Sequence, residues 1–242
     1  MHRRLFSIGA GLALGLSAQV APAAVQVNVV CSMNPEWCRN AAAIYSRLHD
    51  VQVNVINKPT GESYAQLQAE RERSKVDLWF GSTADPHLQA AENGLTEVYR
   101  SPKLPQLHPW AQAVAKGESA LSVSFLHNAA QEAEAGYPVR HVAPCEGIGY
   151  SVGAMSLVKG GPNPEQGRRF YEWALSVPGQ KVAATSRSYQ FPSNKATPVP
   201  PGAPSLAGVT LISYDIARYG ASAERRRLLA RWEQEIGSKA VR

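Results

Sequence analysis

The sequence has few cysteines, little excess charge of either sign and only one long apolar run. Of its 242 residues three are cysteine, and 25 basic side chains stand against 19 acidic ones. A balance this mild, with no dominant basic run, does not favour nucleic-acid binding and gives only a weak bias towards anionic ligands. Cys31 and Cys38 lie seven positions apart, so an oxidising compartment would allow a local disulfide, and Cys145 is then expected as a small buried side chain.

The one long apolar run lies at the amino terminus. Arg3 and Arg4 precede the apolar residues 5–20, and the small residues 21–23 suit a cleavage site, so residues 1–23 are predicted to be a secretory signal. The run is short and rich in glycine and alanine, which disfavours a spanning helix. No lipobox cysteine follows it, so we expect a soluble protein of the periplasm, with 23 basic and 19 acidic residues left after cleavage.

The chain is organised around residues 76–95, VDLWFGSTADPHLQAAENGL. The apolar start has the length of a buried strand, and a hydroxyl-rich turn follows it. Asp85 and Pro86 predict a helix start with Asp85 as the N-cap, and Asn93-Gly94 predicts the helix end. His87, just inside this helix, is expected to line a site or cap the helix rather than act as a base. A helix N-terminus above a polar turn suits an anion.

Two earlier stretches repeat this pattern. Residues 25–30 and 51–56 alternate apolar and polar side chains, as half-buried strands do. Asn34-Pro35 and Thr60-Gly61 follow them as helix starts, with Thr60 as the expected cap. Three strand–turn–helix units in a row imply parallel strands joined by right-handed crossovers. We therefore predict an α/β fold with a doubly wound, mainly parallel sheet.

The three turns, residues 32–35, 59–63 and 82–86, should lie together at the carboxyl edge of this sheet, where open α/β sheets bind ligands. Each turn carries hydroxyl groups and begins a helix, so we predict one shared anion site. For any single residue, the alternative that its side chain only caps its own helix stays open. The candidate residues are Ser32, Thr60, Gly61, Ser63, Ser82, Thr83, Asp85 and His87.

The second half of the chain carries weaker patterns. Strands are expected at residues 121–126, 139–144, 149–158 and 209–214, the third with glycines that suit a crossing between lobes. Helices are expected at residues 129–135, 165–177 and 223–236, with Pro178-Gly179 ending the second. The last helix should direct its apolar side chains inward and leave its arginines in solvent. Those apolar side chains are Leu228, Leu229, Trp232 and Ile236.

The stretches CSMNPEWC, DLWFGSTADPHLQAAENGL, FLHNA, VAPCEGIGYSVGAMSLVKG and YGASAERRRLLARWE resemble the periplasmic substrate-binding proteins of ABC transporters. The most similar group is the iron(III)-type cluster, which also includes hexose-phosphate binders. The resemblance covers nearly all of the chain after residue 23. It implies a type II clamshell of two lobes, with no cofactor and no enzymatic activity. It also implies a monomer that carries a small anionic solute to an ABC permease and its ATPase.

This chain departs from the family's pattern in two places. Between Trp110 and Lys116, the usual members carry a long segment that includes one hinge crossing and much of the second lobe, and here it is absent. We therefore expect residues 24–110 to form the first part of lobe 1 and residues 111–148 to be a remnant of lobe 2. Residues 149–242 should supply the return strand and the C-terminal helices of lobe 1. The family's FLHD motif is FLHN here, with Asn128 in place of the acid.

The hexose-phosphate branch resembles this chain at Ser32, His127, Asn128 and Glu146. By that resemblance, Ser32 and the helix ends would hold a phosphate, and the other three side chains would bond sugar hydroxyls. The ferric branch typically uses two adjacent tyrosines, and this sequence has no such pair. Because Fe(III) prefers phenolate and carboxylate oxygens, no metal ligand is assigned.

Three alternatives remain open. The chain could be a ferric-iron-binding protein of an ABC importer, or a shortened homologue that no longer transports. It could also be an enzyme built on Cys145 with His127 and Glu146. The enzyme is disfavoured because Cys145 lacks a nucleophile-elbow context and His127 lacks metal-ligand spacing, so no catalytic residue is assigned.

Overall fold

The computed structural model describes residues 25–106, 125–134 and 143–237, and its centre is a four-stranded sheet in the order β2-β1-β3-β4. The predicted signal, residues 1–23, lies outside the described residues. The strands are β1 (Gln26–Cys31), β2 (Gln52–Asn57), β3 (Leu78–Thr83) and β4 (Gly153–Leu157). The first three strands fall within two or three residues of the positions that the sequence predicts.

Strands β1, β2 and β3 are parallel, and β4 runs antiparallel to β3 at one edge. The registers pair Val29 with Val55 on one side and with Leu78 on the other. The chain leaves β1 for the strand on one side, β2, and then crosses back over β1 to reach β3. Where the connections that follow two neighbouring parallel strands lead in opposite directions, a crevice opens at the carboxyl ends of those strands. The predicted doubly wound, mainly parallel sheet is therefore confirmed.

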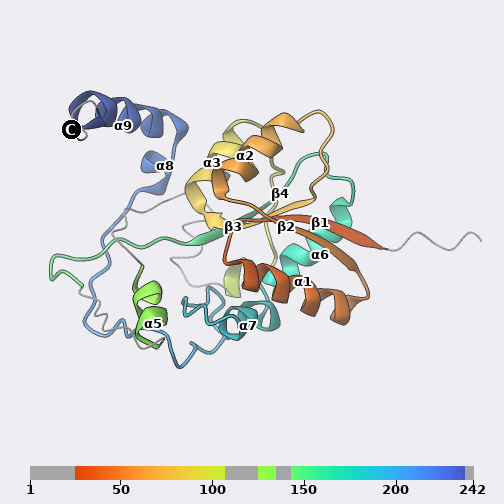
Figure 1. The fold of residues 1–242 in the computed structure, drawn as a ribbon, viewed down its shortest axis with the longest axis horizontal. Helices are drawn as coiled ribbons and strands as arrows, with labels where there is room; N and C mark the ends of the chain where they lie inside the picture. Colours follow the sequence, from red (N-terminus) through yellow and green to blue (C-terminus); the bar gives the residue numbers. More distant parts are fainter. Residues whose placement is uncertain (1–24, 107–124, 135–142, 238–242) are drawn as a thin grey trace, which may run out of the picture.

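Helices cover both faces of the sheet, as Figure 1 shows. On one face, α1 (Pro35–His49), α6 (Pro164–Ala174) and α7 (Val177–Thr185) enclose a core with Val27, Tyr45, Phe170 and Trp173. On the other face, α2 (Thr60–Ala69) and α3 (Ala84–Glu92) enclose a second core. That core contains Val30, Leu67, Trp79 and Ala90. Alternate residues of one strand, such as Val29 and Val30, therefore serve opposite faces.

The remaining elements lie outside these layers. They are the 3-10 turn η1 (Leu104–Gln106), α5 (Leu126–Glu134), α8 (Ile216–Tyr219) and α9 (Ser222–Glu235). In Figure 1, α5 lies at the lower left of the molecule, and α9 lies at the upper left beside the C-terminus. None of the described helices is long and apolar enough to cross a membrane.

Of the three predicted helix caps, one is confirmed and two are wrong. Asn34 caps α1 and its side chain accepts from the backbone N–H of Glu36 and of Trp37. Thr60 is the first residue of α2 and not its cap, which is Pro59. Asp85 lies inside α3, whose cap is Thr83, because β3 continues through the residues expected to form a turn. Backbone conformations with positive φ at Gly81 and Ser82 and a bulge in the pairing with β4 allow that continuation.

Several predictions for the second half are wrong. Leu126, His127 and Asn128 belong to helix α5, not to the end of a strand, and residues 121–124 and 139–142 lie outside the described residues. Strand β4 is shorter than predicted, and residues 209–214 form only a single bridge, between Ile148 and Leu211. Pro178 lies in the first turn of α7, where its missing N–H has no helical partner, so it begins a helix instead of ending one.

The apolar side chains of the last helix are exposed, contrary to prediction. The exposed fractions are 45% for Leu228, 47% for Leu229, 55% for Trp232 and 46% for Ile236. The helical periodicity was correctly identified, since α9 covers the expected residues, but no described element packs over its apolar stripe. Cys145 is also exposed and not buried. Cys31 and Cys38, whose spacing left a disulfide open, do form one.

Candidate functional site

Two hydroxyl–hydroxyl hydrogen bonds join the three predicted turns into one site. Ser32, after β1, lies with its Oγ 2.9 Å from the Oγ of Ser63 in α2. Thr60, at the start of α2, lies with its Oγ1 2.9 Å from the Oγ of Ser82 at the end of β3. In each pair either oxygen can donate, so the hydrogens can turn towards whatever occupies the crevice. The carboxyl edge of the sheet therefore brings together side chains up to fifty positions apart in the sequence.

Two helices begin at this site without a side-chain cap. The side chains of the cap residues of α2 and α3, Pro59 and Thr83, accept no hydrogen bond from the backbone N–H groups of the first turn. The first backbone N–H groups of a helix have no partner within it, and the helix dipole makes this end positive. A Cβ added to Gly61 would meet nothing within 4 Å, so the start of α2 is open. Uncapped N–H groups and the hydroxyls beside them suit a small anion.

Trp79 fixes the position of Ser32 from the protein interior. Its indole Nε1 donates to the Ser32 Oγ across 2.9 Å, and its ring is fully buried between the helices and the sheet. Ser63 is also fully buried, so it orients Ser32 and does not itself reach solvent. Of the residues predicted in the three turns, those that keep exposed surface are Ser32, Thr60, Gly61, Ser82, Thr83 and Asp85.

The turn after β1 is held from two further sides. Asn57, the last residue of β2, donates through Nδ2 to the carbonyls of Cys31 and Met33, at 3.0 Å each. The disulfide ties Cys31 to Cys38 in the first turns of α1. Both features fix the backbone around Ser32 before a ligand arrives, which lowers the entropic cost of binding.

Ser82 occupies a backbone conformation that disfavours most side chains. Its φ is 83°, in the left-handed region where a side chain costs free energy. Strain of this kind is concentrated at ligand-binding sites. The conformation places the Ser82 hydroxyl beside Thr60 and leaves the side chain partly exposed.

His87 lies beneath the site and is not available to a ligand. Its Nε2 is 2.8 Å from the carbonyl oxygen of Gly81, its Nδ1 is 2.7 Å from the Oγ of Ser156, and its ring stacks on Trp79. Because a carbonyl can only accept, Nε2 carries the proton and Nδ1 accepts from the serine. Burial lowers the pKa of His87 to about 4. The side chain therefore acts as a neutral bridge between β3 and β4.

This neutral bridge predicts an acid sensitivity. The unfolded histidine takes up a proton near pH 6.5, whereas the folded one does so only near pH 4. The contribution of neutral His87 to stability is therefore complete above pH 6.5 and is lost as the pH falls towards 4. Between pH 7 and pH 5, the wild type should lose about 2 kcal/mol of unfolding free energy more than His87→Gln does. Urea unfolding at both pH values measures this difference. The exposed-site control, His49→Gln, should behave as wild type, and equal pH dependence in His87→Gln would show that the bridge is not neutral.

Thr83 and Asp85 bond to each other at the start of α3. The Thr83 hydroxyl donates to the Oδ1 of Asp85 in a short contact. A carboxylate in the first turn of a helix interacts favourably with the dipole, but it also competes with an anionic ligand for the same positive end. Asp85 therefore fits the role of a residue that limits which anions enter.

The residues assigned by resemblance to a sugar lie apart from the three turns. His127 is in the first turn of α5, where it stacks on Phe125 and burial lowers its pKa. Asn128 is exposed on the same helix. Glu146 is exposed in the loop before β4, and hydrogen bonds from its own backbone N–H and from Cys145 lower its pKa. No hydrogen bond joins these three side chains to the turns among the described residues, so the structure assembles the phosphate half of the predicted site and not the sugar half.

Three residues that the sequence analysis missed shape this site: Trp79, Asn57 and Gly81. Trp79 and Gly81 lay in the predicted strand and turn, and Asn57 lay directly after a predicted strand. At such positions a side chain usually serves the packing of the protein and not a ligand site. A Cβ on Gly81 would lie 1.9 Å from the Cγ of Met33, so the absence of a side chain at Gly81 leaves room for Met33 of the turn after β1. The signal available in the sequence was weak: an asparagine ending a strand, a tryptophan within one, and a glycine after one.

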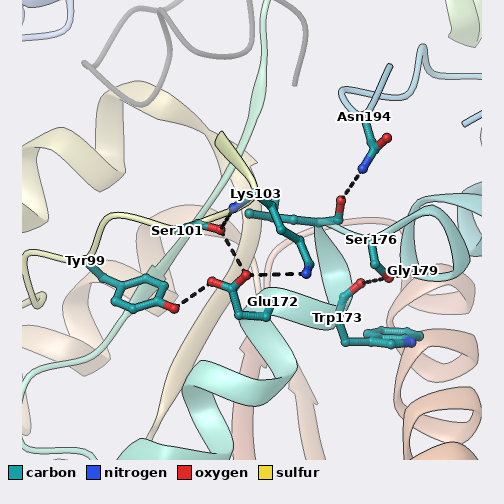
Figure 2. Close-up of polar contacts among 9 residues, drawn as sticks. Tyr99, Ser101, Lys103, Glu172, Trp173, Ser176, Gly179 and Asn194 are labelled. Carbon is teal, nitrogen blue, oxygen red and sulfur yellow. Dashed lines mark hydrogen bonds and ion pairs between the residues drawn. The ribbon is translucent and has the colours of Figure 1, made fainter. Parts of the chain in front are cut away.

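A surface groove of about 520 Å³ lies elsewhere, between the end of α1 and α6. Its polar wall is a cluster centred on Glu172 of α6, which accepts from the Tyr99 hydroxyl at 2.6 Å and the Ser101 hydroxyl at 3.0 Å (Figure 2). Lys103 lies 3.8 Å from the same carboxylate. Burial and the neighbouring carboxylate raise the pKa of Tyr99 to about 12. This cluster fastens the segment after α3 to α6, and none of the residues lining the groove belongs to the three turns.

The residues that the structure describes contain no cluster of three or more histidine, cysteine, aspartate or glutamate side chains that could hold a metal ion. The three turns contribute hydroxyls, two helix N-termini and the Asp85 carboxylate to the candidate site, and the helix N-termini suit an anion.

No family model matches the chain, but comparison with known proteins gives clear relatives. The periplasmic binding protein AfuA from Actinobacillus pleuropneumoniae, in a structure with exogenous fructose-6-phosphate bound, is 26% identical with a TM-score of 0.81; the match covers 89% of this chain and 99% of AfuA. The periplasmic binding protein P5PA is 21% identical with a TM-score of 0.78, over 88% of this chain and 99% of P5PA. Iron-bound HitA from Pseudomonas aeruginosa is 14% identical with a TM-score of 0.59, over 84% of this chain and 99% of HitA. These neighbours are binding proteins and not enzymes.

An uncharacterised protein of Haemophilus influenzae is 27% identical over 331 aligned residues, with 95% of each chain covered. That alignment is longer than the 242 residues of this chain, so a sizeable part of the relative has no counterpart here. A single helix, α5, is described between η1 and β4, where a second lobe would be built. The doubly wound sheet and these solved structures together show that the chain has the type II periplasmic-binding-protein fold with a truncated second lobe, and that it is similar to periplasmic substrate-binding proteins.

Proposed function

We propose that this protein is the solute-binding component of an ABC importer and that its solute is a small phosphorylated molecule such as a sugar phosphate. The proposal includes export to the periplasm by the signal at residues 1–23. It rests on one observation above all: Ser32, Thr60 and Ser82 converge on the uncapped N-termini of α2 and α3. Phosphate oxygens accept hydrogen bonds from hydroxyls and backbone N–H groups, and the helix dipoles favour their charge.

The relatives support this choice of ligand over ferric iron. AfuA, which is similar to this chain at a TM-score of 0.81, holds fructose-6-phosphate in its structure, whereas iron-bound HitA is similar only at 0.59. The described residues also offer no carboxylate and histidine cluster for a metal. By resemblance, His127, Asn128 and Glu146 would approach the sugar when a ligand draws α5 and the loop before β4 towards the three turns.

The proposal predicts that Thr60→Val weakens binding of a sugar phosphate by roughly tenfold, because one hydrogen bond to a charged group is worth about 1.5 kcal/mol or more. Valine keeps the shape of threonine, so the melting temperature of the unliganded protein should stay nearly unchanged. Calorimetric titration with fructose-6-phosphate measures the affinity. The matched control is Thr96→Val, since Thr96 is equally half-buried and lies outside the site.

Four probes separate the possible solutes. Fructose-6-phosphate should raise the melting temperature, inorganic phosphate should raise it less, and fructose without phosphate should leave it unchanged, because only a ligand of the folded state stabilises it by mass action. Stabilisation by ferric citrate alone would contradict the proposal. Stabilisation by none of the four probes would favour a shortened homologue that no longer binds or transports.

A further inference from the structure

The C-terminal helix α9 presents an apolar stripe that nothing in the described chain covers. Leu228, Leu229, Trp232 and Ile236 are 45% to 55% exposed, and no residue of the helix is buried. At 100° per residue these four side chains fall within one sector about 100° wide, which Arg225 also enters one turn before Leu229. A stripe this regular is the pattern of a helix that packs against a partner. Figure 1 shows α9 beside the C-terminus, away from the helices that cover the sheet.

The helix is held at its base rather than along its length. Ser222, its first residue, donates through both its backbone N–H and its hydroxyl to Glu92 of α3. The preceding helix α8 is anchored by the buried side chain of Ile216. The stripe is therefore presented on a fixed support and does not need to leave another contact before it meets a partner.

The charges that flank the stripe indicate what the partner is. Arg227 pairs with Glu224 at 2.6 Å, and Arg231 pairs with Glu235 at 2.8 Å, on one side of the stripe. On the other side lie Arg226 and Glu233, seven residues apart, and neither has an ion-pair partner among the described residues. Seven residues are two helical turns, so the two unpaired and opposite charges lie on the same flank.

An antiparallel arrangement of two such helices satisfies both charges at once. When two identical helices pack antiparallel, the same flank of each meets its counterpart, so Arg226 of one copy comes to lie opposite Glu233 of the other, twice by symmetry. In a parallel pair, that flank would meet the opposite flank of the partner and both charges would stay unpaired. Antiparallel packing also sets Leu229 against Trp232 of the other copy at the centre.

We propose that two copies of this chain associate through the apolar stripe of α9, with the helices antiparallel about a two-fold axis near Ala230 and Arg231. The contact is a single pair of helices of 14 residues, so it is smaller than the interface of a permanent dimer. Association should therefore be weak and depend on protein concentration. This proposal differs from the monomer that the family resemblance implies.

Sedimentation velocity over a concentration series tests the proposal with the processed chain. The weight-average mass of the wild type should rise from that of one chain towards that of two. Leu229→Glu combined with Trp232→Glu should weaken association at least hundredfold, by placing acids in the centre of the stripe. The matched control, Leu48→Glu, replaces a leucine of α1 that is 60% exposed and should associate as the wild type does.

A charge exchange tests the antiparallel register. Arg226→Glu alone and Glu233→Arg alone should each weaken association by roughly tenfold, and the double variant should recover to near the wild-type value, because it restores two opposite-charge pairs. These exposed substitutions leave the fold untouched, so circular dichroism should be unchanged. A wild type that stays monomeric throughout, or a double variant no better than the single ones, overturns the proposal. So does a monomer that floats with anionic phospholipid vesicles through the same stripe.

Discussion

Gly81→Ala is expected to lower the free energy of unfolding by about 3 kcal/mol or more, a large part of the stability of a domain of this size. Two effects add. The φ of Gly81 is 86°, where any Cβ is strained, and the new Cβ would lie 1.9 Å from the Cγ of Met33. Relieving that overlap requires the Met33 side chain to leave its position or the turn after β1 to move away from β3. Since this turn carries Ser32, binding of a phosphate ester should weaken together with stability.

Gly94→Ala is the matched control for this prediction. Gly94 has a φ of 68°, also in the left-handed region, but a Cβ added there would meet nothing within 4 Å. Its replacement should cost only the backbone strain, about 1 kcal/mol. Urea unfolding of both variants gives the comparison, and the difference between them isolates the contact with Met33. Equal losses would mean that the Met33 side chain swings aside and that Gly81 does not position the turn.

The first half of the fold was predictable because local patterns and the global arrangement agree there. Strands β1 and β2 alternate apolar and polar residues, and Asn34-Pro35 begins α1 as expected. Once three strand–turn–helix units are recognised, the handedness of crossovers leaves few topologies, and one of them places Ser32, Thr60 and Ser82 at a common edge. Their convergence thus follows from the order of elements without any knowledge of the contacts.

The details of the site depend on conformations that residue type does not encode. Ser82 adopts a positive φ that serine disfavours, and β3 therefore runs through the expected turn to end at Thr83. Asp77, within an apolar stretch, is fully buried and accepts from the backbone N–H of Asn28 at 2.7 Å and from Asn163. Nothing in the local sequence separates such a buried, hydrogen-bonded carboxylate from a solvent-exposed one.

The second half was predicted poorly because its pattern belongs to a larger protein. The local pattern of residues 121–126 placed His127 at a strand end, while in the structure it lies in the first turn of helix α5. The apolar stripe of α9 indicated a buried helix, and it is exposed because nothing in the described chain covers it. Periodicity shows that a helix has an apolar face, but not which element covers that face.

Removal of the disulfide by Cys31→Ser combined with Cys38→Ser is expected to cost about 2.5 kcal/mol of unfolding free energy, the loop-closure value for a cross-link between residues seven positions apart. The bond joins the end of β1 to the first turns of α1 and so fixes both ends of the turn that carries Ser32. Loss of the bond leaves Asn57 as the main restraint on that turn. Affinity for a phosphate ester should therefore fall as well, because the turn must be ordered when the ligand binds.

Thiol counting and one control variant decide how this result is interpreted. Cys31 is fully buried and Cys38 is 2% exposed, whereas Cys145 is exposed. A thiol reagent should therefore label one cysteine in the native protein, still one after unfolding in urea, and three after unfolding with a reductant. Cys145→Ser should abolish the native labelling and leave both stability and affinity unchanged. A double variant as stable as the wild type, but with weaker binding, would mean that the disulfide acts on the ligand site alone and that the β1–α1 junction holds its conformation without it.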